Sequence, residues 1–167
     1  MFEGVIFSLT LFSALGSGLM AGVFFAFSAF VMKAFARLPA AQGILAMQSI
    51  NVAVINTLFL LVFLGTAVSC GILAVFSLLR WRYPGAGYLL AGCFLYLVGT
   101  LVVTIVFNVP RNNALAAVDP ASTDGVRLWA DYLARWTAWN HVRTAAALAA
   151  SAAFTIALCS RRAGDAL

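Results

Sequence analysis

The chain has 167 residues, of which 64% are apolar and only 9% are charged. Soluble domains contain about 45–50% apolar and about 25% charged residues, so this composition excludes an ordinary soluble enzyme, a disordered segment and a disulfide-rich secreted module. The formal net charge of +5 comes from basic residues at the ends of apolar runs, which favours contact with lipid headgroups over nucleic-acid binding. The sequence therefore predicts an integral membrane protein with a single domain.

The first predicted span covers residues 5–31, more than the roughly 20 residues that a helix needs to cross a bilayer. Small residues recur along it at every fourth position, and they are Ala14, Gly18, Gly22 and Ala26. Such a face lets a second helix approach closely, either within the chain or in a homo-oligomer through Gly18 and Gly22. A polar segment follows at residues 33–51, and an interfacial helix is expected in it from Ala40.

The second predicted span covers residues 54–79 and ends at the sequence RWRYPG, residues 80–85, where basic and aromatic anchors precede a turn. The third span covers residues 88–107 and ends at the sequence NVPRNN, residues 108–113. Pro110 lacks a backbone N–H group, so it is expected to bend or interrupt the helix and to free a backbone carbonyl.

The most polar part of the chain, residues 114–135, holds three of the five acidic residues. We expect a turn at Asp119, followed by a short helix that Ser122 or Thr123 caps. The fourth span covers residues 139–160. The predicted fold is therefore all-α, an integral membrane four-helix bundle with a short polar helix or loop between spans three and four.

An even number of spans places both termini on the same side of the membrane. The tight basic pairs lie on that side, and they are Arg80 with Arg82 and Arg161 with Arg162. By the positive-inside rule these pairs favour a cytoplasmic location of the termini in a bacterial plasma membrane.

Two polar segments lie at the same membrane edge, because residues 108–113 end the third span and residues 136–143 begin the fourth. At about 100° per residue, one face of the fourth helix carries two indoles, an amide and a guanidinium, from Trp136, Trp139, Asn140 and Arg143. Polar and ionisable residues inside a membrane usually mark a functional site. We therefore expect this face to point into the bundle, towards Asn108 and Asn112.

Each of these residues also has a structural interpretation. Interfacial tryptophans commonly anchor a helix, Arg143 can extend towards the headgroups, and asparagines beside Pro110 can cap a helix end. The only histidine, His141, lies on the flank of the polar face and can simply bond at a helix end. With one histidine and no Cys-x-x-Cys pair, neither a metal site nor a thiol redox pair is expected.

Three stretches together resemble the DUF1772 family, also called the anthrone oxygenase-like family. They are GLMAGVFFAFS at residues 18–28, FNVPRNN at residues 107–113 and WTAWNHVR at residues 136–143. The resemblance extends over nearly the whole chain and implies a four-span membrane protein. Some fungal members oxidise an anthrone to an anthraquinone with molecular oxygen, so the resemblance implies an oxygenase-like enzyme for a hydrophobic aromatic substrate.

Such an oxidation begins with loss of a methylene proton, which gives a delocalised oxyanion that reacts with oxygen without metal or flavin. The chain has no Gly-rich dinucleotide loop, so no cofactor is expected. The polar residues of the two motifs are the predicted catalytic residues, and they are His141, Arg143, Asn140, Asn108 and Asn112. Histidine ordinarily titrates near neutral pH and is therefore the natural base. Arginine and asparagine donors suit the oxyanion, and Asn108 is a candidate for orienting a water molecule or the base.

The predicted substrate-binding residues are Trp136, Trp139, Asn113 and Phe107, because aromatic faces stack on a flat substrate. The predicted partners are the lipid bilayer and a hydrophobic aromatic molecule. The alternative is a non-catalytic module that binds a small molecule or only joins spans three and four. A transporter is disfavoured, because the predicted spans contain no central carboxylate.

Overall fold

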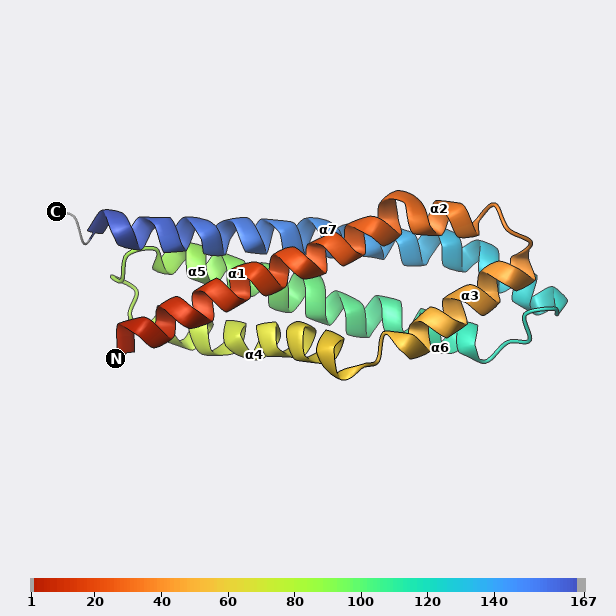
Figure 1. The fold of residues 1–167 in the computed structure, drawn as a ribbon, viewed down its shortest axis with the longest axis horizontal. Helices are drawn as coiled ribbons and strands as arrows, with labels where there is room; N and C mark the ends of the chain where they lie inside the picture. The colour runs from red at the N-terminus through yellow and green to blue at the C-terminus, as the bar shows by residue number, and fades with distance from the viewer. Residues whose placement is uncertain (1, 165–167) are drawn as a thin grey trace.

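The computed structural model describes the backbone of residues 2–164 and the side chains of residues 3–160. Over these residues the chain is all-helical, with no strand, and four helices are long and apolar enough to cross a membrane. Their bounds are Glu3–Phe35, Thr57–Leu79, Ala86–Ala116 and Thr123–Ser160. The predicted all-α four-helix bundle is confirmed (Figure 1).

The first long helix extends beyond the predicted span. It consists of α1 (Phe2–Ala26), a π-helical turn η1 (Phe27–Val31) and α2 (Met32–Phe35), without a break. After Pro39 the chain turns back through α3 (Ala40–Ala53), which is the helix expected in the polar segment. The α1 helix begins and the α7 helix ends at the same end of the bundle (Figure 1). The side chains of Arg161 and Arg162 lie outside the described residues, so the predicted membrane orientation stays a prediction.

Residue Asn56 starts the second long helix, α4 (Thr57–Leu79), because its side-chain oxygen accepts the N–H of Phe59 at 3.0 Å. The turn at residues 80–85 is present and ends at Gly85, whose φ of 82° places it in the left-handed region. Glycine adopts this conformation without the steric cost that other residues incur. The next helix, α5 (Ala86–Tyr96), begins there.

The third long helix does not end at Pro110. Two π-helical segments, η2 (Leu97–Val102) and η3 (Thr104–Asn108), join α5 to α6 (Val109–Ala116). The N–H of Val109 donates to the carbonyl of Thr104, five residues earlier, and Pro110 then occupies the first turn of α6. A proline is tolerated at that position because its missing N–H is not needed there.

The fourth helix, α7 (Thr123–Gly164), has 42 residues and measures roughly 63 Å at about 1.5 Å per residue. The predicted turn and cap are confirmed, since Asp119 accepts the N–H of Ala121 at 3.0 Å and Ser122 Oγ accepts the N–H of Gly125 at 3.0 Å. The prediction of a separate short helix after this cap is wrong, because α7 continues without a break. Residues 126–160 contain neither glycine nor proline, so nothing interrupts the helix.

Helix α7 packs along the small-residue face of α1. Ser151 Oγ donates to the carbonyl of Ala14 at 2.9 Å. A Cβ atom placed on Gly18 would lie 3.2 Å from Ser151 Oγ. A Cβ atom on Gly22 would meet nothing within 4 Å. The face is therefore used within the chain over part of its length, and the homo-oligomer stays an expectation.

Candidate functional site

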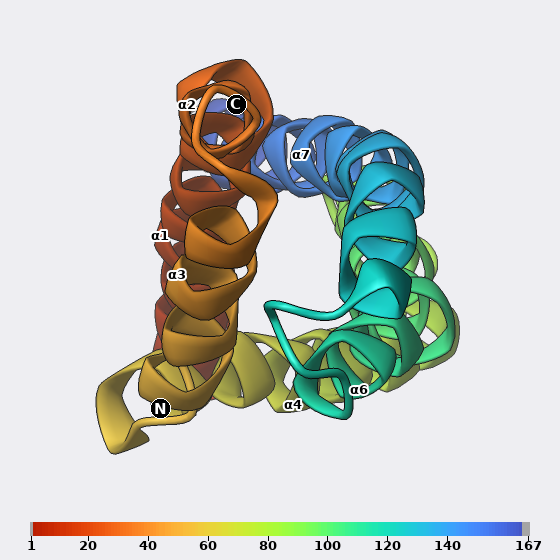
Figure 2. The same ribbon diagram turned by 90° about the vertical axis from the view of Figure 1, so that its right-hand side faces the viewer.

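A cavity of about 610 Å³ lies between the helices in the half of the bundle that contains α3 and α6. Viewed from that end, α1 and α3 stand on one side, α6 and α7 on the other, and α4 lies along the bottom (Figure 2). The lining is mostly apolar, and its polar members besides Trp136 are Gln48, Asn51, Thr104, Asn112, Asn113, Asn140 and Arg143. Every lining residue belongs to the described part of the chain, and Arg143 is the only charged one.

Arg143 is a buried cation with neutral neighbours. Its side chain is only 5% exposed, and its guanidinium donates to the side-chain oxygen of Asn140 and to Thr104 Oγ1, the latter at 3.3 Å. The guanidinium carbon also lies 4.3 Å from the ring centre of Phe24 and 5.2 Å from that of Trp136. Ring faces compensate only part of the cost of burying a charge. The site therefore favours an anionic or strongly polar oxygen beside Arg143.

The side chain of Asn140 is held in one orientation by α1. Its amide nitrogen donates to the carbonyl of Phe24 at 2.7 Å and to Ser28 Oγ at 2.6 Å. Because both donors are engaged, the amide oxygen is left to accept from Arg143. This bond fixes the guanidinium at the cavity wall, while its Nε has no hydrogen-bond partner among the described residues.

The two sequence motifs meet at Trp136, as expected. Asn108, which is 1% exposed, donates to the carbonyl of Trp136 at 3.2 Å. The side-chain oxygen of Asn112 accepts two hydrogen bonds of 2.8 Å, from Trp136 Nε1 and from the hydroxyl of Tyr132. With its oxygen occupied, Asn112 has its amide nitrogen left to donate into the cavity that it lines.

Five of the nine predicted site residues line the cavity, and they are Asn112, Asn113, Trp136, Asn140 and Arg143. Asn108 is buried behind them. The other three lie outside. His141 is exposed, and Phe107 stacks on Trp139 with ring centroids 3.6 Å apart and planes 6° apart.

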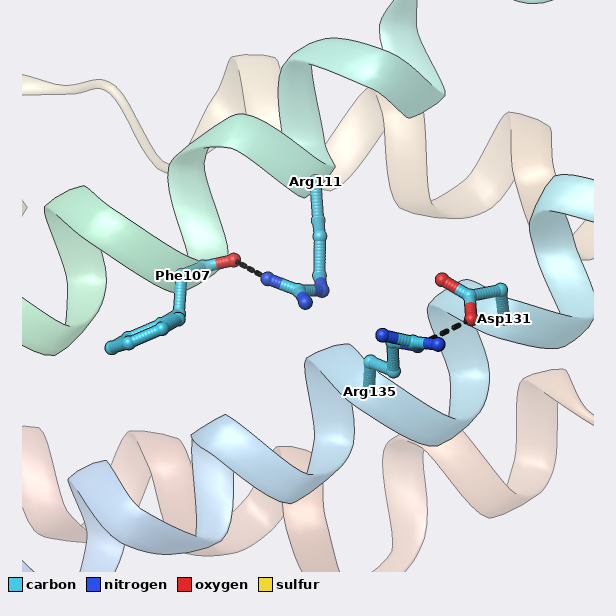
Figure 3. Close-up of polar contacts among 4 residues, drawn as sticks. All are labelled: Phe107, Arg111, Asp131 and Arg135. Carbon is cyan, nitrogen blue, oxygen red and sulfur yellow. Dashed lines mark hydrogen bonds and ion pairs between the residues drawn. The ribbon is translucent and has the colours of Figure 1, made fainter.

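Near Pro110, a side chain of the same helix bonds a backbone carbonyl. The guanidinium of Arg111 donates to the carbonyl of Phe107 on its own helix. Figure 3 shows the Arg111 side chain pointing across to α7, where Arg135 pairs with Asp131 at 2.6 Å. Arg111 does not line the cavity and instead stabilises the helix around the proline.

Sequence reasoning missed several residues of the site. Phe24, Ser28, Thr104 and Tyr132 contact its polar groups, and α3 supplies part of the cavity wall. Tyr132 lies four residues before Trp136, so helical periodicity alone puts the two on one face, and their rings stack 5.7 Å apart. No comparable signal marks Thr104 or α3, because both depend on how the helices pack.

The described residues contain no group of three or more His, Cys, Asp or Glu side chains that could hold a metal ion. Donors in the cavity are instead amides, a hydroxyl and a guanidinium, beside aromatic faces. This set can hold a flat molecule and stabilise negative charge on its oxygen.

A family model described as anthrone oxygenase matches residues 59–153, which is more than half of the chain. The match contains both motifs that meet at Trp136 but not the stretch at residues 18–28, so it is shorter than the expected resemblance. Comparisons with curated proteins and with solved structures found no match.

Proposed function

The chain belongs to the anthrone oxygenase family, and we propose that it is a membrane-embedded oxygenase that oxidises a flat aromatic substrate of anthrone type with molecular oxygen. The observation that carries this proposal is the buried guanidinium of Arg143 at the wall of an otherwise uncharged, largely apolar cavity. An anthrone combines the two properties that such a site favours, because its rings are apolar and its reactive form is an oxyanion.

The reaction balances without a further reductant. Loss of one proton from the methylene carbon gives an enolate, whose negative charge lies largely on the carbonyl oxygen. The carbanionic carbon forms a bond to O₂, and the resulting peroxide takes up a proton. Loss of the remaining C–H proton and cleavage of the O–O bond release water and form the second carbonyl. The substrate carbon is oxidised and O₂ is reduced, so anthrone and O₂ give anthraquinone and water.

The cavity residues support the first step, the loss of the methylene proton. Arg143 and the amide nitrogen of Asn112 are donors for the enolate oxygen, and the indole of Trp136 offers a stacking surface. In a site that excludes water, fixed donors stabilise a developing charge far better than they do in water. Their effect is to make the substrate more acidic when it is bound.

The proton acceptor is not among the predicted residues in the cavity. His141 is exposed, and the lining residues include neither a histidine nor a carboxylate. We therefore assign the proton to water, with the acceleration coming from stabilisation of the enolate. In this mechanism His141 is dispensable.

The test uses the purified chain in lipid nanodiscs with anthrone. The expected result is faster oxygen consumption and faster appearance of anthraquinone than in empty nanodiscs, with one O₂ consumed for each quinone formed. An unchanged rate with well-folded protein would overturn the proposal.

The competing function is a non-catalytic structural clasp, that is, a set of hydrogen bonds that only joins the third and fourth helices. It is supported by the bonds that Asn108 and Asn112 make with Trp136.

A further inference from the structure

The cavity is open on one side, and its exposed lining residues mark the mouth; apart from Asn113 they are apolar. The large apolar ones are Val52, Ile55, Leu64, Ile105 and Val109, with exposures of 75%, 70%, 46%, 56% and 39%. Val52 lies at the end of α3, Ile55 in the α3–α4 junction and Leu64 on α4, and the last two come from the third long helix. The mouth is thus a lateral gap between α4 and the third helix.

The position of the mouth along α4 sets its depth in the membrane. This helix has 23 residues and measures roughly 35 Å at about 1.5 Å per residue, just more than the roughly 30 Å of bilayer hydrocarbon. Its first turns, which carry the mouth residue Leu64, therefore lie within one edge of the hydrocarbon layer. Exposed apolar side chains are costly in water and cost nothing in lipid, so a mouth of this composition suits the lipid side.

A packed cluster of residues from α2, α3, α6 and α7 borders the cavity, and Met47 and Trp136 of this cluster also line it. This end cluster consists of Met32, Ile44, Met47, Leu115, Trp129, Tyr132 and Trp136. Gly43 allows α3 to approach α7, because a Cβ atom there would lie 2.7 Å from the Trp129 ring. The side chain of Gln48 also joins α3 to the third helix and the following loop, donating to the carbonyls of Leu115 at 2.8 Å and Val118 at 3.3 Å.

We propose that the ligand of this cavity enters and leaves laterally, directly from the bilayer. The ligand is a flat aromatic molecule dissolved in the lipid, and it enters with its oxygen-bearing edge first. The path leads from a largely apolar mouth to the buried side chains of Arg143 and Asn140. The buried end cluster packs beside the same wall, which it shares through Trp136. The route itself is independent of the chemistry, and only the identity of the ligand rests on the proposed function.

A cysteine reporter tests the route without any ligand. In a Cys159→Ala background, which removes the exposed cysteine, Leu101→Cys places a thiol on the inner wall. We expect an uncharged, lipid-soluble maleimide to label this thiol faster than a membrane-impermeant sulfonated maleimide. Val23→Cys is a second reporter on the opposite helix, for use if the first variant folds poorly.

Blocking the mouth provides the decisive comparison. Ile105→Trp should slow labelling by the lipid-soluble maleimide at least several-fold. Leu78→Trp is the matched control, because Leu78 is 66% exposed on α4 and lies away from the cavity. Equal labelling in these two variants, or equally fast labelling by the sulfonated reagent, would overturn the lateral route.

The same variants separate this inference from the proposed function. In nanodiscs, Ile105→Trp is expected to lower kcat/KM for anthrone several-fold with kcat nearly unchanged. If the mouth controls labelling but anthrone is never oxidised, the lateral route stands and the proposed substrate is wrong. If anthrone is oxidised equally well by both tryptophan variants and labelling is also unaffected, the oxygenase function stands and the lateral route is wrong.

Discussion

The guanidinium of Arg143 donates to the side-chain oxygen of Asn140, one helical turn earlier on α7, and both side chains are buried. Asn140 is held in turn by Phe24 and Ser28 of the first helix. A charge that would cost free energy in the bundle is thus fixed at the wall of the cavity rather than turned towards the headgroups.

Replacing Arg143 by methionine should separate catalysis from stability. Arg143→Met removes the donor for the enolate, so anthrone oxidation should fall to the rate in empty nanodiscs. A buried charge with only neutral partners is removed at the same time, but the buried Asn140 oxygen loses its donor, so the melting temperature should change little. Quinone absorbance and thermal unfolding in detergent measure the two effects. Full turnover in this variant would exclude the assigned role, and a large loss of stability would favour the structural clasp.

The Ser28 hydroxyl is expected to contribute to stability through Asn140. Ser28→Ala removes the acceptor of one of the two N–H groups of the buried Asn140 amide. A buried N–H group without a partner costs about 1–3 kcal/mol. The matched control is Ser160→Ala, whose hydroxyl bonds only to the carbonyl of Ile156 at an exposed position. Thermal unfolding should show a clear decrease for the first variant and almost none for the second. Equal melting temperatures would mean that the bond to Ser28 is unimportant.

Tyr132 is expected to act as a positioning residue for Asn112. Tyr132→Phe removes one of the two donors to the Asn112 oxygen, which loosens the amide that faces the cavity. We expect kcat to fall several-fold, with a stability loss of only about 0.5–1.5 kcal/mol. Steady-state kinetics with anthrone provide the measurement. An unchanged kcat with the same stability loss would assign Tyr132 a structural role alone.

His141 should be dispensable, although the sequence makes it the natural base. It is exposed and does not line the cavity, so His141→Ala should retain the rate of the unmodified protein and the same pH profile. The comparison requires turnover measured across the neutral pH range. Loss of activity, or loss of a titration near neutral pH, would restore His141 as the base and replace water in the mechanism.

Two glycines provide a test of the helix packing itself. A Cβ atom on Gly92 of α5 would lie 2.7 Å from the buried Phe154 ring, so Gly92→Ala should destabilise the protein by about 1–3 kcal/mol. A Cβ atom on Gly71 of α4 would meet nothing within 4 Å, and Gly71→Ala should stabilise its helix by about 0.5–1 kcal/mol. Thermal unfolding should therefore move in opposite directions. Shifts of the same sign would contradict the packing of α5 on α7.

The part of the candidate site that lies on a single helix could be predicted from the sequence. Periodicity along residues 136–143 placed Trp136, Asn140 and Arg143 on one face, and all three line the cavity. The same periodicity also included Trp139, whose ring instead stacks on Phe107 outside the cavity. A helical repeat defines which residues share a face, but it contains no information on which neighbouring helix covers each edge of that face.

The sequence by itself determined the four apolar spans, the polar edge and the residues that share a helix face, because these follow from composition and local periodicity. Only the tertiary structure decided that the third helix continues through Pro110, that α3 forms part of the cavity wall, and that a lateral mouth remains. It also decided where the guanidinium of Arg143 lies, because Arg143 bonds to Asn140. The hydrogen bond that orients Asn140 joins it to Phe24, 116 positions earlier in the chain. Such contacts depend on how whole helices pack, and no local pattern encodes that arrangement.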